Sequence, residues 1–98
     1  MITRIVRMEF RPEEVATFLA VFEESKALIR HFPGVNHLEL HRDATLENVF
    51  FTYSIWDGPE ALEAYRHSPL FKSVWARTKI LFAGKPQAWS LNQLMVVD

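Results

Sequence analysis

Three side chains that can do chemistry stand at alternate positions near the middle of the chain: His37, Glu39 and His41. Alternate residues of a β-strand project from one face, with Cα atoms roughly 6.5–7 Å apart. Two imidazoles and a carboxylate at that spacing suit a zinc or iron ion, or acid–base catalysis. The alternative is paired charge inside a subunit interface, where Glu39 meets Arg7 or a histidine of a second copy. We take the paired-charge interpretation as the expectation and predict no metal here.

A second set of residues is aromatic and recurs at helical spacing or at the end of a strand. Flat aromatic substrates bind well between such rings, because offset stacking contributes about 0.5–1.5 kcal/mol per ring pair beyond the burial of area. Aromatic residues at this spacing also form ordinary hydrophobic cores, which is the competing interpretation. The side chains that we predict to line a substrate pocket are Phe22, Trp56, Phe71 and Trp75.

Tyr65 and His67 are the predicted catalytic residues. A tyrosine hydroxyl rarely stays buried without a hydrogen-bond partner, so Tyr65 is expected to orient a substrate. His67 lies close to Ser68-Pro69, where the helix should break, and it is a candidate for proton transfer at the mouth of the pocket. The competing interpretation of His67 is a solvated surface histidine.

The composition excludes several classes of function. The 98 residues are expected to form one domain over residues 1–98. The formal net charge of −1 comes without a basic stripe, so we predict no nucleic-acid partner. The absence of cysteine excludes disulfides, thiolate metal sites and a cysteine nucleophile.

Nothing in the sequence predicts export or membrane insertion. Charges interrupt the first seven residues, which argues against a signal peptide. No apolar run approaches the roughly 20 residues of a membrane span. We therefore expect a cytoplasmic protein with no membrane partner. A hydrophobic share of 49% is high for so short a chain, and it predicts that a second subunit covers part of the apolar surface.

Alternation of apolar and polar residues predicts four strands. The first covers residues 2–10, with Val6, Met8 and Phe10 on one face and Arg7 and Glu9 on the other. The others cover residues 35–42, 49–56 and 88–97. The polar residues 43–48 predict a hairpin loop between the two middle strands.

Apolar residues at three- and four-residue spacing predict the helices. The first helix begins at Pro12 and ends near His31, because Pro33-Gly34 cannot continue it. We expect Asp57 to cap the second helix, with Pro59 in its first turn.

The third helix should begin at Ser68-Pro69, with the serine as its cap, and should stop before Gly84 and Pro86. The resulting element order, βαββααβ, is an α+β ferredoxin-like sandwich: a four-stranded antiparallel sheet with helices on one face.

The other face of that sheet would be bare. The last predicted strand carries Leu91, Leu94 and Val96, and sheets normally bury an apolar face against another layer. A two-fold homodimer whose sheets face each other would cover this surface and protect an exposed edge. We therefore predict a homodimer.

Several short motifs resemble one protein family over almost the whole chain. They are Phe32-Pro33-Gly34, Glu39-Leu40, Trp56, Glu60-Ala61-Leu62 and Ser68-Pro69-Leu70-Phe71. In these motifs the sequence is similar to the antibiotic biosynthesis monooxygenase family. The resemblance implies a dimeric α+β barrel, and it implies an oxygenase that works without a metal or another cofactor.

The sequence also departs from the residue patterns of two branches of the family. The haem-degrading branch uses an Asn–Trp–His triad, and those places hold Val6, Tyr65 and Trp75 here, so haem degradation is not expected. Quinol-oxidising relatives often carry histidine at the places of Tyr65 and Leu70, so no catalytic histidine is carried over from them.

The expected function is therefore a cofactor-independent monooxygenase acting on a small aromatic substrate, a quinol, an anthrone or a similar phenol. The alternative is a non-catalytic protein that binds a small ligand, or serves assembly, on the same scaffold. An open cavity of a few hundred Å³ would favour the enzyme. A filled interior, with Tyr65 bonded to the backbone, would favour the alternative.

Overall fold

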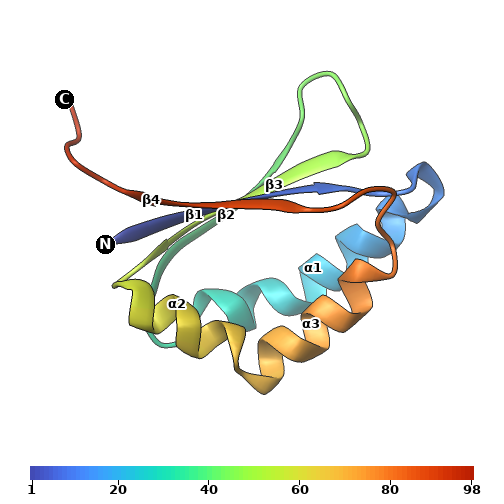
Figure 1. Ribbon diagram of the computed structural model, residues 1–98. Coiled ribbons are helices and arrows are strands. Elements are labelled where there is room, and N and C mark those ends of the chain that lie inside the picture. Colours follow the sequence, from blue (N-terminus) through green and yellow to red (C-terminus); the bar gives the residue numbers. More distant parts are fainter.

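The chain folds into two layers, a sheet and a set of helices that all lie on one of its faces (Figure 1). The computed structural model describes all residues from 1 to 98. The elements are β1 (Ile2–Glu9), a short 3₁₀ helix η1 (Pro12–Glu14), α1 (Val15–Arg30), β2 (Val35–Arg42), β3 (Val49–Trp56), α2 (Pro59–Arg66), α3 (Pro69–Lys79) and β4 (Gln87–Asn92).

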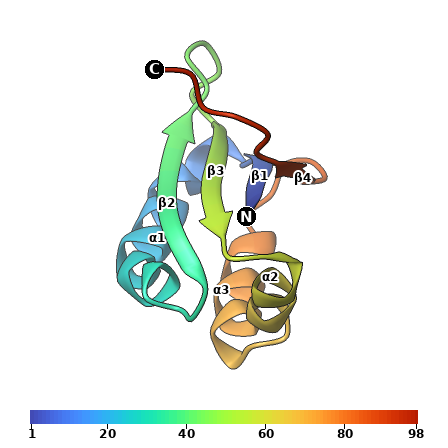
Figure 2. The same cartoon turned by 90° about the vertical axis from the view of Figure 1, so that its left-hand side faces the viewer.

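The four strands form one antiparallel sheet in the order β2-β3-β1-β4, which Figure 2 shows from β2 across to β4. The order and the helices on one face confirm the predicted ferredoxin-like plan. None of the helices is long and apolar enough to span a bilayer.

The last strand is shorter than predicted. It ends at Asn92, which pairs with Ile2, rather than continuing to Val97. The apolar pattern beyond residue 92 is real, but β1 begins at Ile2 and offers no further backbone partner for a ladder. The residues that follow, Leu94 to Val97, are all strongly exposed.

The predicted cap of α2 is wrong. Gly58 is the N-cap residue, and no side chain caps this helix, although Pro59 does open it. The carboxylate of Asp57 instead accepts a hydrogen bond from Asn36 Nδ2 at 2.8 Å, which ties the start of β2 to the end of β3. A partner far away in sequence therefore replaces the local capping contact.

The predicted cap of α3 is confirmed. The hydroxyl oxygen of Ser68 accepts a hydrogen bond from the backbone N–H of Phe71 at 3.1 Å, and Pro69 opens the helix. The same hydroxyl donates to the backbone carbonyl of Tyr65 at 2.6 Å. One side chain thus joins the end of α2 to the start of α3.

Gly34 holds the turn before β2 against α2. Its φ of 92° lies in the left-handed region that favours glycine. A Cβ placed on Gly34 would lie 2.5 Å from the Cβ of Ala61, so no other residue fits without displacing the helix. The carbonyl of Gly34 also accepts a hydrogen bond from the backbone N–H of Asp57 at 2.8 Å.

Two clusters of buried apolar side chains fill the space between the sheet and the helices. Phe10 stacks on Phe18 in the larger cluster, with the ring centroids 4.1 Å apart. The larger cluster consists of Met8, Phe10, Phe18, Phe50 and Leu81, and the smaller one consists of Val35, Trp56 and Leu62.

The sheet face turned away from the helices, here called the outer face, has no covering layer within the chain (Figure 1). Register places apolar side chains next to one another on it; Ile5, for example, lies between Tyr53 and Trp89. Trp89 is 43% exposed and Leu91 is 49% exposed. The outer-face apolar residues are Ile5, Phe51, Tyr53, Ile55, Trp89 and Leu91.

Candidate functional site

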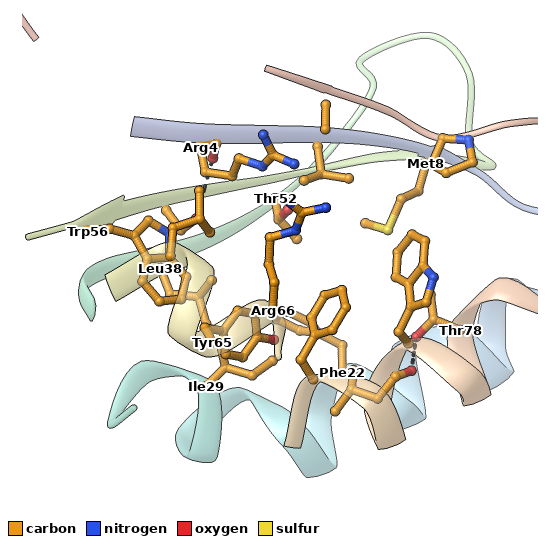
Figure 3. Close-up of a pocket in the computed structure, with 18 of the residues that line it drawn as sticks. Arg4, Met8, Phe22, Ile29, Leu38, Thr52, Trp56, Tyr65, Arg66 and Thr78 are labelled. Atoms are coloured by element: carbon orange, nitrogen blue, oxygen red, sulfur yellow. Dashed lines mark hydrogen bonds between the residues drawn. The ribbon is translucent and has the colours of Figure 1, made fainter. Parts of the chain in front are cut away.

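A cavity of about 350 Å³ lies between the sheet and the helices, between the two apolar clusters (Figure 3). Small-molecule sites commonly have volumes from about 300 to 1,000 Å³. The interior is therefore open, as the enzyme hypothesis requires. All of the aromatic side chains predicted to form a pocket line this cavity: Phe22, Trp56, Tyr65, Phe71 and Trp75.

The secondary structure explains why these side chains converge. Alternate positions of β1 and β3 face the helices, which brings Met8 and Thr52 to the wall formed by the sheet. Phe71 and Trp75 are four residues apart on α3 and therefore lie on one helix face. Phe22 comes from α1.

The rings form a continuous wall. The Tyr65 ring centroid lies 5.0 Å from Trp56 and 5.2 Å from Phe71. Phe71 and Trp75 stack at 5.8 Å with an interplanar angle of 12°. Trp56 is only 2% exposed, and its indole N–H donates to Ser54 Oγ at 2.9 Å. It is therefore the fixed end of the wall, and the other rings line the cavity beside it.

Tyr65 presents its hydroxyl to the cavity (Figure 3). The hydroxyl makes no hydrogen bond within the chain, and no buried side-chain polar atom lacks a partner, so this oxygen is open to the cavity rather than sealed in the core. Burial raises the pKa of Tyr65 to about 12. The group therefore stays protonated at neutral pH and is available as a hydrogen-bond donor.

Two arginines that the sequence analysis did not single out also line the cavity. Arg4 lies on the helix-facing side of β1, and its Nη1 donates to Ser90 Oγ at 2.9 Å. Arg66 ends α2 and contacts the Glu63 carboxylate at 3.5 Å. Arg4 stands two residues before the apolar Val6 on β1, so the two side chains share the face that is turned to the helices. A cationic residue at such an inward-facing position was the signal in the sequence that could have identified Arg4 as a site residue.

His67 is not among the residues that line the cavity. Its side chain is 71% exposed at the end of α2, where Nδ1–H donates to the Glu63 carbonyl at 2.9 Å. The structure therefore does not bring His67 together with Tyr65 at the pocket. The proton-transfer role remains a prediction from sequence, and the geometry of the single chain does not support it.

His37, Glu39 and His41 lie on the outer face of the sheet, away from the cavity. Glu39 accepts hydrogen bonds from both imidazoles, at 2.6 Å from His41 Nε2. Hydrogen bonding by His37 and then by His41 lowers the pKa of the exposed Glu39 carboxyl. No group of three or more histidine and acidic side chains in the chain could hold a metal ion.

Glu39 therefore pairs within its own strand rather than with Arg7, because its histidine neighbours project from the same face. The sequence left open which face carries these residues. The structure places them on the outer face.

Comparison with known proteins agrees with this fold. The family model for antibiotic biosynthesis monooxygenase matches residues 1–77. No curated protein gives a significant match to the sequence.

Many solved structures resemble the chain. A proposed antibiotic biosynthesis monooxygenase from Caulobacter crescentus CB15 has a TM-score of 0.90 at 24% identity, with 96% of this chain and 90% of that chain covered. Rv0793 from Mycobacterium tuberculosis has a TM-score of 0.89 at 18% identity, with 99% and 98% covered. A proposed antibiotic biosynthesis monooxygenase from Bordetella bronchiseptica has a TM-score of 0.85 at 20% identity, with 96% and 97% covered. At these identities the likeness shows a shared fold.

Proposed function

This chain belongs to the antibiotic biosynthesis monooxygenase family, and on that premise we propose that it is a cofactor-independent monooxygenase of a quinol, an anthrone or a similar electron-rich phenol. One observation carries the proposal. The cavity is walled by aromatic rings, and a protonated tyrosine hydroxyl without a partner in the chain faces into it. A flat phenol would stack on the rings and accept a hydrogen bond from that hydroxyl.

In this reaction the substrate supplies all of the electrons. A deprotonated phenol passes one electron to O₂ and then combines with the superoxide that forms. For an anthrone, the ring methylene loses two hydrogens and gains one oxygen atom of O₂, while the second oxygen atom leaves with those hydrogens as water. Atoms and electrons balance without an external reductant. The protein has to bind the ring, favour its ionised form and exclude water.

Tyr65 has a defined part in this scheme. A phenol whose pKa is about 12 cannot act as a general base near pH 7, because it is already protonated. It can donate a hydrogen bond to the oxygen of the substrate and so set the orientation of the ring. Trp75 and Phe71, stacked on each other, would hold the ring plane.

Ionisation of the substrate does not depend on a carboxylate or an imidazole in the cavity. The lining contains no aspartate, glutamate or histidine. Its charged side chains are the guanidinium groups of Arg4 and Arg66, and positive charge close to a phenol lowers the pKa of that phenol. The substrate proton would then pass to water at the mouth of the cavity.

We also propose that the protein acts as a homodimer whose outer faces pack together. Trp89 and Leu91 leave apolar surface in contact with solvent in the single chain, together with the exposed segment Leu94–Val97. A second copy would cover both. It would also enclose Glu39 and its histidine partners as an already paired polar set.

A second candidate function is non-catalytic binding of a small aromatic ligand on the same scaffold. The lack of any acid–base residue in the cavity lining is the observation that favours it. Both candidate functions predict that an aromatic ligand binds in the cavity. Only the monooxygenase predicts that the ligand is oxidised and that O₂ is consumed.

The deciding experiment measures oxygen uptake by the purified protein with a panel of hydroquinones and anthrones. We expect uptake above a heat-killed control, and a loss of about tenfold or more in Tyr65→Phe, which removes the hydrogen bond to the substrate and little else. Tyr53→Phe is the matched control, because Tyr53 lies on the outer face and should keep wild-type uptake. Uptake that is absent from the whole panel would favour the binding function.

A further inference from the structure

The cavity is lined mostly by apolar side chains, and two guanidinium groups also line it. Arg4 comes from the first strand and Arg66 from the end of α2, and Figure 3 shows both side chains reaching into the space between the sheet and the helices. The other labelled residues in that view that are not apolar are Thr52, Tyr65 and Thr78, none of which is charged at neutral pH. Two cations in an otherwise neutral, mostly apolar cavity need an explanation.

Neither guanidinium is satisfied by a partner in the chain. Each guanidinium has five N–H donors in a planar fork. Arg4 uses one of them on the neutral hydroxyl of Ser90, and Arg66 makes one long contact of 3.5 Å with Glu63. Glu63 is thus the one carboxylate that pairs with Arg66, at long range, and no carboxylate pairs with Arg4, although a carboxylate is the usual partner of a guanidinium removed from water.

The charges around Arg4 show the same imbalance. Burial, followed by repulsion from Arg66, lowers the pKa of Arg4, and attraction by Glu63 offsets only part of this. Glu63 lies outside the cavity lining, and its side chain is more than half exposed. Its carboxylate is also in contact with the imidazole of His67. The folded chain thus holds two like charges together with incomplete compensation, an arrangement that a bound anion would relieve.

We infer that this cavity selects a flat aromatic molecule that carries a negatively charged group, in the simplest case a carboxylate held between Arg4 and Arg66. The ring would lie against Tyr65, Phe71 and Trp75, and the carboxylate would accept hydrogen bonds from the free donors of the two forks. The inference rests on the proposed function only in taking this cavity as the substrate site. It narrows the substrate class from electron-rich phenols to those that bear an acidic substituent.

The shape of the site agrees with this orientation. The Arg66 side chain is about half exposed and therefore meets solvent, whereas Trp56 at the aromatic wall is buried. A ligand would place its apolar ring inside and its charged group at the mouth. This arrangement keeps the carboxylate partly hydrated, which reduces the cost of binding it.

The test compares two probes that differ only in charge, 2-naphthoate and 2-naphthamide, by calorimetric titration of the purified protein at low ionic strength. We expect naphthoate to bind at least about tenfold more tightly, and the difference to shrink as salt is added. Arg66→Gln and Arg4→Gln should each weaken naphthoate binding by about tenfold while changing naphthamide binding by less than about twofold. Arg66 is exposed enough that its variant should fold normally.

Lys72→Gln is the matched control, because it removes one positive charge from an exposed position of α3 that is outside the cavity lining. It should retain the preference for naphthoate. Equal binding of the two probes by the wild type, no binding of naphthoate, or a preference that survives both arginine substitutions would each overturn the inference.

The outcomes separate this inference from the proposed function. Oxygen uptake with neutral hydroquinones, together with equal binding of the two probes, would retain the monooxygenase and remove the acidic substrate class. A clear arginine-dependent preference for naphthoate, without oxygen uptake from any hydroquinone or anthrone, would retain the anion site in a protein that only binds.

Discussion

The ring of Tyr65 lies 5.0 Å from the ring of Trp56, so the residue that carries the tyrosine hydroxyl of the cavity packs against one of the most buried side chains in the protein. Trp56 is in turn held by its hydrogen bond to Ser54. On the other side, the backbone carbonyl of Tyr65 is bonded by the Ser68 hydroxyl that caps α3. The position of the Tyr65 hydroxyl is thus set by both core packing and a helix cap, which is the rigidity that an orienting residue needs.

The first prediction concerns the ionisation of Tyr65. Its pKa of about 12 in the folded chain lies above the usual value of 10.0, because burial disfavours the phenolate. The folded state therefore holds this proton more tightly than the unfolded state between pH 10 and 12. The free energy of unfolding should be unaffected below pH 10 and should fall by about 2 kcal/mol as the pH rises to 12.

Two measurements check this prediction. Ultraviolet titration should show one tyrosine that ionises near pH 12, and this step should disappear in Tyr65→Phe. Denaturant unfolding of Tyr65→Phe should lose much of the decline in stability above pH 10, whereas Tyr53→Phe should keep it. A Tyr65 that titrates at pH 10 in the folded protein would contradict the burial that the structure shows.

The second prediction concerns the turn at Gly34. Replacing Gly34 by alanine combines a positive φ with a Cβ that would lie 2.5 Å from the Cβ of Ala61. The substitution should lower the free energy of unfolding by about 1–3 kcal/mol, measured by urea denaturation. It should also loosen α2, on which Tyr65 lies, and so weaken binding of aromatic ligands.

Gly84→Ala is the control for that substitution. A Cβ there would meet only the carboxylate end of the Glu9 side chain, at 2.9 Å, and that group can move aside. This variant should unfold within about 0.5 kcal/mol of the wild type. If the two variants proved equally stable, Gly34 would not be the strained position that the structure indicates.

The third prediction concerns assembly. Leu91→Lys places a charge on the outer face at the edge strand β4, beside Thr3 of β1 in the sheet register, where the second copy is proposed to pack. We expect the wild-type protein to sediment at twice the chain mass and Leu91→Lys to sediment as a single chain, because an unpaired buried charge opposes association.

Leu28→Lys is the matched control, since Leu28 is an exposed leucine on α1, which packs on the helix side of the sheet. It should leave the association state unchanged. A wild-type protein that sediments as a single well-folded chain would remove the homodimer, and the cavity would then have to function without a second copy.

Local patterns accounted for most of the fold. The Ser68-Pro69 start of α3 was predictable because an N-cap bond joins residues three apart, and the strands were predictable because alternation is a property of the local backbone. Asp57 shows where local reasoning fails. Its carboxylate could bond either a backbone N–H at the start of α2 or a distant side chain. It bonds the distant Asn36, because folding brings β2 beside it.

The aromatic part of the site followed from the sequence in the same way, since Phe71 and Trp75 share a helix face by spacing alone. The charged part did not. Arg4 lies in the first strand and Arg66 at the end of α2, far apart in the sequence. Only the packing of α2 against the sheet brings both to one cavity. His67, one residue beyond Arg66, was predicted at the same place and instead faces solvent.

The sequence by itself therefore determined the elements, their order, the rings that line the cavity, and the shared face of His37, Glu39 and His41. The tertiary structure decided which face of the sheet the helices cover, where β4 ends, and which charges meet inside. The physical reason is the range of the interactions. Periodicity and capping act over a few residues, whereas the face that is buried and the charges that converge depend on how the whole sheet packs against its helices.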